Sequence, residues 1–514
     1  MFSDNDLKQI SSHELSLEIV SKQIEQFKIG FPPTLLQAPA LPENHGLKIL
    51  KDSEVTQKIE YYQSRLADFK VIKFVPASGA ATRMFKTLFS FLLDYQGTEE
   101  DYQKLISDQS EGSVFTFFKE IERFAFYHDL KRTYKEKTGS SLEEDQVKKA
   151  YAQIIKTLLE EDGMDYGNLP KGLLLFHSYD RGVRTPVEEH MVEGIHYAKN
   201  ADQAVKLHFT VSPDHLRKFE EHVESIKTNY ESEFGVNIHV SYSIQKPSTD
   251  TIAVDLDNQP FRNEDQSLLF RPAGHGALLA NLNDLESDVV FLKNVDNVVP
   301  DHLKPETIRY KKVIGGILLE YHERIASTLQ KLAENQGIND ALDLLERDLG
   351  FKPGPNFQSF SESEKVRFLS KKLHRPLRVC GMVKSDGDPG GGPFWVKGKD
   401  GSSSLQVVET AQIDLNDEQQ KAVFSKATHF NPVDVVCMIR DHQGNKFDLM
   451  KHRDMDTGFI TKKSKDGKDL KAQELPGLWN GSMADWNTVF VEVPAITFNP
   501  VKSVNDLLKK EHQG

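Results

Sequence analysis

Short segments that combine small residues with charged side chains are the part of the sequence best suited to chemistry. The first is Lys73-Phe-Val-Pro-Ala-Ser-Gly-Ala-Ala-Thr-Arg83, which lies between an apolar run and an amphipathic pattern. Small residues at a strand-to-helix turn let backbone N–H groups and the positive end of a helix approach a phosphate, and Arg83 adds a side-chain donor. Taken alone, the segment is equally typical of a tight turn with a surface arginine.

Two further segments place a lysine or a histidine beside glycine. Pro170-Lys-Gly172 precedes an apolar run, so the ammonium group of Lys171 could lie above a crevice. Pro272-Ala-Gly-His-Gly276 opens a helical pattern, and its glycines would admit a flat or phosphorylated ligand close to the backbone. The alternatives are a solvated lysine and a helix N-terminal turn with an exposed histidine.

The last two segments follow apolar runs. Asn294-Val-Asp-Asn297 places Asp296 at the carboxyl end of a predicted strand, where ligands of open α/β sheets bind and where a carboxylate suits Mg²⁺. Turn formation would explain the same residues. Phe498-Asn-Pro-Val-Lys502, taken alone, predicts no more than a strand, a turn and a helix cap.

The pattern of the surrounding sequence predicts helices and strands of an α/β fold, which would position these segments. Short β-branched runs alternate with helical patterns, which favours βαβ units and a mixed, mainly parallel sheet flanked by helices. The predicted strands are 71–75, 173–176, 205–211, 236–242, 289–292, 406–409, 433–438 and 489–493.

Changes in the pattern of apolar and polar residues along the chain divide it into four regions. We expect an N-terminal helical extension at 1–69, an α/β core at 70–304, a helical insertion at 305–375 and a β-rich part at 376–514 that returns to the core. A glycine- and proline-rich turn at 387–393 precedes the β-rich part, and no flexible linker separates it as a free module.

Composition excludes several classes of protein. With 38% hydrophobic and 27% charged residues the chain is globular, and its net charge of −13 disfavours nucleic acid as a partner. Its two cysteines cannot form a disulfide framework or a cysteine-based zinc site, and they suit a reducing compartment. No signal peptide and no apolar run of membrane-spanning length is visible, so we expect a cytoplasmic protein.

The order of the five segments resembles the UDP-sugar pyrophosphorylase family, which includes UDP-glucose and UDP-N-acetylglucosamine pyrophosphorylases. That family has a G-G-x-G-T-R-like loop, then a P-K-G segment, a P-x-G-H-G or G-N-G segment, an N-x-D-N segment and an F-x-P-[VL]-K segment. This chain has a counterpart of each in the same order. The resemblance covers about 70–300 and 375–508. The chain also resembles a bacterial family of unassigned function that looks like a distant branch of this group.

The resemblance implies a nucleotide-diphospho-sugar transferase fold and a role for each segment. The loop with Ala77, Ser78, Gly79, Ala80 and Thr82 would bind nucleotide phosphates, with Arg83, Lys171 and Lys502 as catalytic cations and Asp296 as the Mg²⁺ ligand. Base and ribose would contact Gln245, Gly274, His275 and Gly276, and the sugar would contact Asn297 and Glu409.

The reaction so implied joins a nucleoside triphosphate, UTP first among the candidates, with a sugar 1-phosphate, and releases pyrophosphate. One departure from the family pattern bears on turnover: Pro76, Ala77, Ala80 and Ala81 replace glycines of the phosphate loop, and their Cβ atoms limit how closely the backbone approaches phosphate. A catalytically silent nucleotide-sugar-binding protein therefore stays an alternative. A glycosyltransferase on the same fold is a third, although its metal motif would have to be Asp255-Leu-Asp257, which reads better as a turn.

Overall fold

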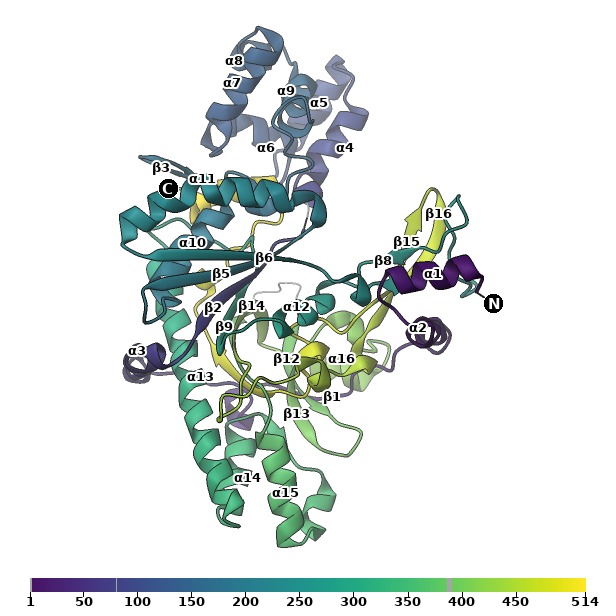
Figure 1. Ribbon diagram of the computed structural model, residues 1–514. Helices are drawn as coiled ribbons and strands as arrows, with labels where there is room; N and C mark the ends of the chain where they lie inside the picture. The colour runs from purple at the N-terminus through teal and green to yellow at the C-terminus, as the bar shows by residue number, and fades with distance from the viewer. Residues whose placement is uncertain (1, 80, 386–390) are drawn as a thin grey trace. The chain divides into compact units, whose positions relative to one another are not determined.

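The computed structural model describes residues 2–79, 81–385 and 391–514 (Figure 1). The chain folds into two compact units, each assembled from three separate stretches. Unit 1 comprises Met1–Phe74, Ser243–Leu292 and Lys311–Ala495, and unit 2 comprises Val75–Tyr242, Lys293–Tyr310 and Ile496–Gly514. Ala80 and most of the predicted turn at 387–393 lie outside the described residues.

Unit 1 is built on five neighbouring strands of a mixed sheet, in the order β17-β11-β14-β9-β2. β2 runs parallel to β9 and β11 runs parallel to β17, whereas β11 and β14 are antiparallel. Their bounds are β2 Val71–Pro76, β9 Val289–Lys293, β11 Leu377–Lys384, β14 His429–Met438 and β17 Asn487–Glu492. The predicted α/β class, with a mainly parallel sheet flanked by helices, is confirmed.

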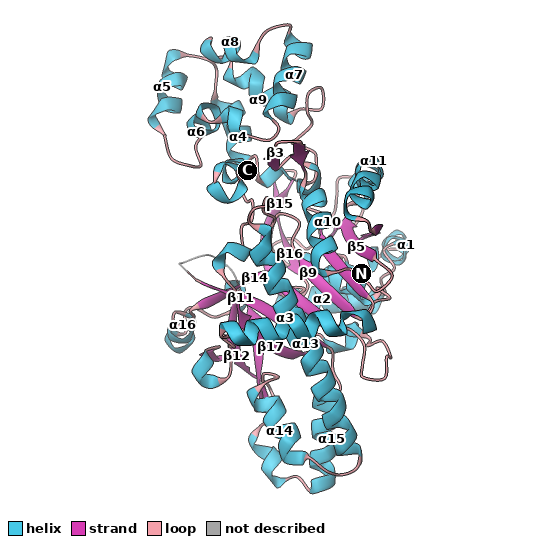
Figure 2. Cartoon of the chain, turned by 90° about the vertical axis from the view of Figure 1, so that its left-hand side faces the viewer, coloured by secondary structure: helices cyan, strands magenta, loops and turns pink. Residues whose placement is uncertain are grey.

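Two helices pack against one another beside this sheet (Figure 2). They are α3 (Asp52–Arg65) and α13 (Lys304–Ala333). A Cβ atom added to Gly316 of α13 would lie 2.1 Å from the Lys58 carbonyl oxygen of α3, so only glycine allows this approach. Tyr62 of α3 meets the ring of Phe291 in β9 edge-on, with ring centroids 6.1 Å apart, which anchors the helices to the sheet.

A second, four-stranded sheet in unit 1 has the order β1-β12-β13-β10. Its strands are β1 (Leu36–Pro39), β10 (Phe351–Lys352), β12 (Gly392–Lys397) and β13 (Ser403–Val408). Alternate residues of both sheets, such as Phe74, Cys380, Trp395 and Leu405, fill one buried apolar cluster. Such alternation is what burial of one face of a strand requires.

The rest of unit 1 adds helices and short hairpins. Helices α1 and α2 share a small apolar cluster with β7 and β8, so the N-terminal region is packed and not free. These remaining elements are α1 Asp4–Ser12, α2 Leu17–Ile29, β7 Thr251–Ile252, β8 Phe270–Arg271, α12 Leu279–Asn283, α14 Ile338–Arg347, α15 Glu362–Leu373, α16 Glu418–Phe424, β15 Phe459–Lys465 and β16 Lys468–Glu474.

Unit 2 contains two long strands, β5 (Ala204–Val211) and β6 (Asn237–Ile244), with helices α10 (Pro186–Tyr197) and α11 (Leu216–Phe234) packed in the same apolar cluster. Six further helices form an all-helical group with an aromatic-rich core of their own. These helices are α4 Lys86–Asp94, α5 Glu99–Ser107, α6 Val114–Lys119, α7 Tyr127–Thr138, α8 Leu142–Val147 and α9 Tyr151–Leu159, and the short strands β3 His177–Tyr179 and β4 Gly182–Arg184 complete the unit.

One predicted strand is wrong. Residues 173–176 are not a strand, because Leu173 ends a 3-10 turn that begins at Lys171 and 174–176 have no regular structure. The run is apolar because it lies between two cores: Leu174 and Phe176 belong to the helical cluster, and Leu173 packs against the cluster around β5. The other predicted strands are present, within a few residues of their expected bounds, and the four-region division of the chain stays a prediction. Among the described residues no helix is both long and apolar enough to cross a membrane.

Candidate functional site

A charged cluster in unit 2 joins three of the predicted site residues. Lys171 Nζ lies 2.9 Å from Oδ2 of Asp296, and Lys502 Nζ lies 3.3 Å from the same oxygen. Lys171 also donates to the carbonyl oxygen of Val501, at 2.7 Å. The cluster is graded in exposure, since the side chains of Asp296 and Lys171 are 10% and 14% exposed but that of Lys502 is 65% exposed. Lys502 is therefore the cation most accessible to a ligand.

Backbone pairing holds the segments of Asp296 and Lys502 together. Val501 N–H donates to the Asp296 carbonyl oxygen at 3.1 Å. The Asn297 carboxamide accepts from the Asn499 N–H at 2.9 Å and donates to the Thr497 carbonyl oxygen at 3.4 Å. Asn297 is almost fully buried, so its role in this structure is to join the two segments, and its predicted contact with a sugar stays a prediction.

Glycine is required directly after Lys171. A Cβ atom at Gly172 would lie 2.9 Å from Phe219 Cζ and 3.3 Å from Val295 Cγ2. The turn can therefore pack against α11 and against the residue preceding Asp296 only without a side chain. This packing explains the Pro-Lys-Gly sequence: proline opens the turn, lysine bears the charge, and glycine lets the turn approach.

The predicted phosphate loop is a neighbour of the same segments. Ala81 N–H donates to the carbonyl oxygen of Leu169, and Val504 N–H donates to that of Met84. Ala77 is buried, whereas Ser78, Gly79, Thr82 and Arg83 are exposed. No hydrogen bond or ion pair to another described residue engages the Arg83 side chain, so this arginine is not joined to the Lys171–Asp296–Lys502 cluster.

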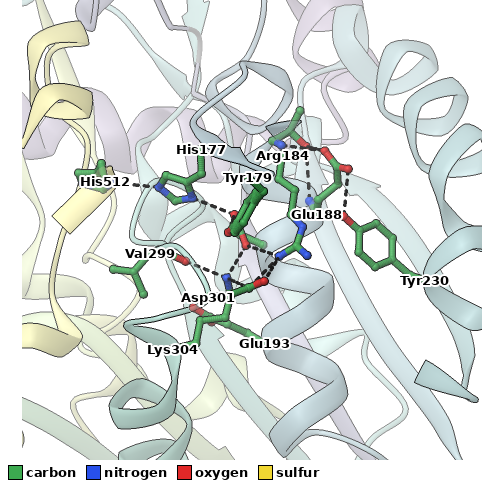
Figure 3. Close-up of polar contacts among 12 residues, drawn as sticks. His177, Tyr179, Arg184, Glu188, Glu193, Tyr230, Val299, Asp301, Lys304 and His512 are labelled. Carbon is green, nitrogen blue, oxygen red and sulfur yellow. Dashed lines mark hydrogen bonds and ion pairs between the residues drawn. The ribbon is translucent and has the colours of Figure 1, made fainter. Parts of the chain in front are cut away.

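A buried network on α10 holds the segments that flank this cluster (Figure 3). Glu189 accepts from Lys304 and, at 2.8 Å, from Nδ1 of His177, while His177 Nε2 lies 3.0 Å from Nδ1 of His512. Burial by itself would raise the pKa of Glu189, but the hydrogen bond from His177 and the Lys304 ammonium group hold that pKa below its usual range. Since His512 follows Lys502 and Lys304 follows Asp296, one carboxylate anchors both segments.

A second cluster, in unit 1, joins two other predicted residues. The Leu478 N–H donates to Nδ1 of His275 at 3.0 Å, so the ring proton is on Nε2, which faces Oε1 of Glu409 at 3.5 Å. The hydrogen bond from His275 lowers the pKa of Glu409 even though burial opposes the shift. Asn480 also donates to Glu409, and Trp479 stacks on the His275 ring with centroids 4.2 Å apart.

The glycines around His275 leave no room for side chains. A Cβ atom at Gly276 would lie 2.1 Å from the Pro476 carbonyl oxygen, and one at Gly477 would lie 2.7 Å from His275 Cε1. Gly274 has a φ of +74°, a conformation that favours glycine. The predicted Gly-His-Gly segment thus serves to bring the loop of Trp479 and Asn480 onto His275.

Gln245 is the predicted site residue with the weakest support. Its amide Nε2 donates to Oδ1 of Asp250 at 3.5 Å, and in the described part of the chain no hydrogen bond joins it to His275 or Glu409. Sequence reasoning missed Trp479 and Asn480 altogether. The signal that could have found them is the Pro-Gly-Leu-Trp-Asn-Gly run at 476–481, in which glycines flank an aromatic and an amide side chain.

Comparison with known sequences assigns the chain to a family. It matches the family described as "Domain of unknown function (DUF4301)" over residues 3–513, and it belongs to that family. The expected membership of a family of unassigned function is thereby confirmed. No curated protein matches the chain.

Solved structures with a similar course of the chain include three sugar-nucleotide enzymes. A UDP-glucose pyrophosphorylase variant from Leishmania major, in complex with UDP-glucose, is 12% identical, with 99% of this chain and 79% of that chain covered and a TM-score of 0.44. A UDP-glucose phosphorylase from Trypanosoma brucei is 13% identical, with 98% and 77% covered and a TM-score of 0.45. A uridine diphosphate N-acetylglucosamine pyrophosphorylase from Trypanosoma brucei is 11% identical, with 98% and 76% covered and a TM-score of 0.46.

Proposed function

We propose that this protein is a sugar-1-phosphate nucleotidyltransferase that joins a nucleoside triphosphate, UTP first among them, with a sugar 1-phosphate. The observation that carries the proposal is that Lys171 and Lys502 both donate to Oδ2 of Asp296. Three motifs that are far apart in the sequence, and that occur in this order in UDP-sugar pyrophosphorylases, thus supply one compact set of charges. Two cations and one carboxylate are the side chains that a phosphate and metal site requires.

The chemistry needs positioning and positive charge more than proton transfer. An oxygen of the sugar 1-phosphate attacks the α-phosphorus, and the bond from that phosphorus to the oxygen bridging the β-phosphorus breaks. Pyrophosphate then leaves with the electron pair. Because the nucleophile is already an anion, no general base is needed, and Lys171, Lys502 and Arg83 have the role of neutralising charge around the phosphorus.

The residues present fit a bound Mg²⁺. Oδ1 of Asp296 has no hydrogen-bond partner among the described residues, so one carboxylate oxygen remains for a metal ion. Within the described part of the chain no group of three or more His, Cys, Asp or Glu side chains could hold a metal by itself. One carboxylate together with substrate phosphates is a common Mg²⁺ site, in which the ion would offset phosphate charge.

Roles for unit 1 follow from its own cluster. We assign the stacked His275 and Trp479 rings, with Gly274 and Gly276, to the base and ribose, because a flat pair of rings offers a stacking surface. Glu409 is assigned to sugar hydroxyls, since its ionised carboxylate is an acceptor. Gln245 keeps its proposed contact with the base.

A silent nucleotide-sugar-binding protein is the second candidate. The observation that favours it is the burial of Ala77 and Ala81, whose side chains are 1% and 0% exposed, where the family pattern has glycine. A glycosyltransferase is less well supported, because the Asp255 carboxylate accepts from the N–H groups of Asp257 and Gln259 and thereby forms a turn.

The test is an assay in the direction of pyrophosphorolysis. The protein, given Mg²⁺, pyrophosphate and a panel of UDP-sugars, should make UTP and sugar 1-phosphate, which ³¹P NMR detects directly. A parallel thermal-shift series with the same nucleotides measures binding. Clear stabilisation without any turnover across the panel would select the silent binder, and absence of both would reject the two candidates together.

A further inference from the structure

Glu189 of α10 is fully buried, and each of its oxygens faces two donor groups. Oε1 accepts from Nδ1 of His177 at 2.8 Å and from the Tyr179 hydroxyl at 2.6 Å. Oε2 accepts from Lys304, and Nη1 of Arg184 lies 3.6 Å from it. The acceptor positions of this carboxylate are therefore in use, so its role depends on the groups that it holds.

One branch of this network reaches the segment of Asp296. Lys304 donates to the carbonyl oxygen of Val299 at 2.8 Å as well as to Glu189 (Figure 3). Val299 follows Asp296 by three residues, and 298–303 belong to no helix or strand. Lys304 therefore fixes a loop that has no regular backbone pairing of its own and that begins at the site carboxylate.

The other branch reaches the segment of Lys502. Nε2 of His177 lies 3.0 Å from Nδ1 of His512, and a hydrogen bond joins the backbone of Asn499 to the same His512 ring. Asn499 precedes Lys502 by three residues. A Cβ atom at Gly514 would lie 2.4 Å from a backbone oxygen of β3, so the chain beyond His512 lies directly against that strand. The two imidazole rings thus link the buried carboxylate to the motif that bears Lys502.

The charges of the network balance within it. Lys304 and Arg184 both pair with Asp301, at 2.9 and 2.7 Å, and both face Glu189, so two cations meet two carboxylates. Burial raises the pKa of Glu189, but the hydrogen bond from His177 and the Lys304 ammonium group offset this effect and keep the carboxylate ionised. A buried ion pair often adds little stability compared with apolar side chains of the same volume. Stability alone therefore does not explain the network, whereas a fixed geometry for the segments that it joins does.

We propose that Glu189 is a positioning residue, which sets where the Lys502 ammonium group and the Asp296 carboxylate lie. It acts from both sides, since each branch ends three residues from one of these two groups. The inference rests on the proposed nucleotidyltransferase function, in which both groups serve the reacting phosphates. In-line attack requires such groups to be held within about 0.5 Å, so a shift in the network lowers turnover more than it lowers substrate binding.

Two substitutions separate the charge of Glu189 from its size. Glu189→Gln keeps the size and loses the charge, and Glu189→Asp keeps the charge. With Mg²⁺, pyrophosphate and UDP-glucose or UDP-N-acetylglucosamine, Glu189→Gln should lower kcat by about tenfold or more. The KM for the UDP-sugar should change by less than about threefold, because its recognition is assigned to unit 1. Glu189→Asp should retain more activity than Glu189→Gln, and the reverse order, expected if only size matters, would overturn the proposal.

A second measurement does not depend on turnover. The N–H groups of Asn499 and Val501 donate to the segment of Asp296, so exchange of these amide hydrogens reports how firmly the two segments are joined. Mass spectrometry of peptides covering 496–504 should show exchange about tenfold faster in Glu189→Gln than in the wild type. Glu189→Asp should lie closer to the wild type.

Glu188→Gln is the matched control. Glu188 precedes Glu189 on α10 and is also buried, but its partners Thr185, Tyr230 and His222 belong to α10 and α11 and not to the two site segments. This variant should match the wild type in kcat and in exchange. Wild-type kcat and exchange in a folded Glu189→Gln protein reject the positioning role. If the wild type itself turns over neither UDP-sugar, the proposed function fails and exchange decides alone, with faster exchange supporting the positioning role and unchanged exchange rejecting it.

Glu189→Gln leaves Lys304 without its buried partner and could prevent folding. The double variant Glu189→Gln, Lys304→Gln removes both charges together and leaves Arg184 and Asp301 paired with each other. It should show the same lower kcat and faster exchange, and wild-type values of both would contradict the proposal.

Discussion

The ammonium group of Lys171 lies 2.9 Å from a carboxylate oxygen of Asp296, although 125 residues separate the two in the sequence. Both side chains are largely buried, and Lys502 approaches the same oxygen from the more exposed side. A ligand phosphate that approached this group would meet Lys502 first, while Lys171 and Asp296 keep their mutual geometry.

Replacing Asp296 with Asn should abolish metal-dependent activity. Asn retains the size of the side chain but not the charge that pairs with two lysines and would hold Mg²⁺. Because Lys171 is mostly buried and keeps only the Val501 carbonyl as acceptor, we also expect a loss of about 1–3 kcal/mol in the free energy of unfolding. Pyrophosphorolysis assays and urea unfolding measure the two effects.

The matched control for this change is Asp214→Asn, which removes an exposed carboxylate of unit 2 and should alter neither property. Near-normal activity and metal dependence in Asp296→Asn would mean that the carboxylate positions Lys171 and Lys502 but does not bind the metal ion.

Replacing Lys502 with Ala should lower kcat by about 10²-fold, the scale of losing one electrostatic stabiliser of the transition state. The side chain is 65% exposed, so the unfolding free energy should change little. Lys510→Ala, in the same C-terminal segment and 91% exposed, is the control. Steady-state kinetics decide the matter, and unchanged kcat and KM in Lys502→Ala would remove the C-terminal segment from the active site.

The buried His512 should make the protein less stable in mild acid. Burial lowers the pKa of His512 to about 3, and the His177 ring acts in the same direction. The pKa of a histidine in the unfolded chain is about 6.5. Between these values the unfolded chain binds one more proton. The free energy of unfolding therefore falls as the pH falls from about 6.5 towards 3, by up to about 1.4 kcal/mol per pH unit.

Asn at position 512 can still donate a hydrogen bond to His177 but does not titrate. In His512→Asn the loss of stability between pH 7 and pH 5 should be smaller than in the wild type, by up to about 2 kcal/mol. Urea unfolding at the two pH values measures this. His45→Asn, at an exposed histidine, should behave as the wild type, and an unchanged pH dependence in His512→Asn would place the acid sensitivity elsewhere.

Gly276→Ala should disturb the loop that bears Trp479 and Asn480. The new methyl group would lie 2.1 Å from the Pro476 carbonyl oxygen, a backbone atom that cannot move without shifting this loop. We expect a loss of stability of about 1–3 kcal/mol and weaker UDP-sugar binding. Gly112→Ala, where no atom lies within 4 Å of the added carbon, should be neutral. Tight UDP-sugar binding by Gly276→Ala would contradict the role given to the loop.

Much of the fold could be predicted because several strands are short runs rich in valine and other apolar residues, as at 205–211 and 289–292. Strand β11 could not, because Arg378 interrupts its apolar pattern. That arginine is fully buried, and it is tolerated because its guanidinium group donates to the Thr488 hydroxyl and the Trp479 carbonyl. These partners lie about a hundred residues further on, so no local pattern reveals them.

In the candidate site, too, local motifs could be predicted and contacts between distant segments could not. Lys171, Asp296 and Lys502 were predictable because each stands in a short motif of small or turn-forming residues, and the motif order places all three. The contact of His275 with Glu409 was not predicted, since it depends on the packing of the Trp479 loop onto the glycines. Whether Arg83 and Gln245 contact a ligand stays a prediction, because their partners would be the ligand itself.

Because the two units are interleaved along the chain, they are completed in a fixed order during synthesis on the ribosome. Unit 2 receives the stretch Ile496–Gly514 only after the last stretch of unit 1 has been synthesised. Chains fold as they emerge, so the helices of unit 2 can pack early, whereas Lys502 joins Asp296 late. A nascent or clipped chain that stops at residue 495 would hold every residue of unit 1 and yet carry an unfinished charged cluster. Such a chain would lack Lys502 beside Asp296 but would retain the His275–Glu409 cluster of unit 1.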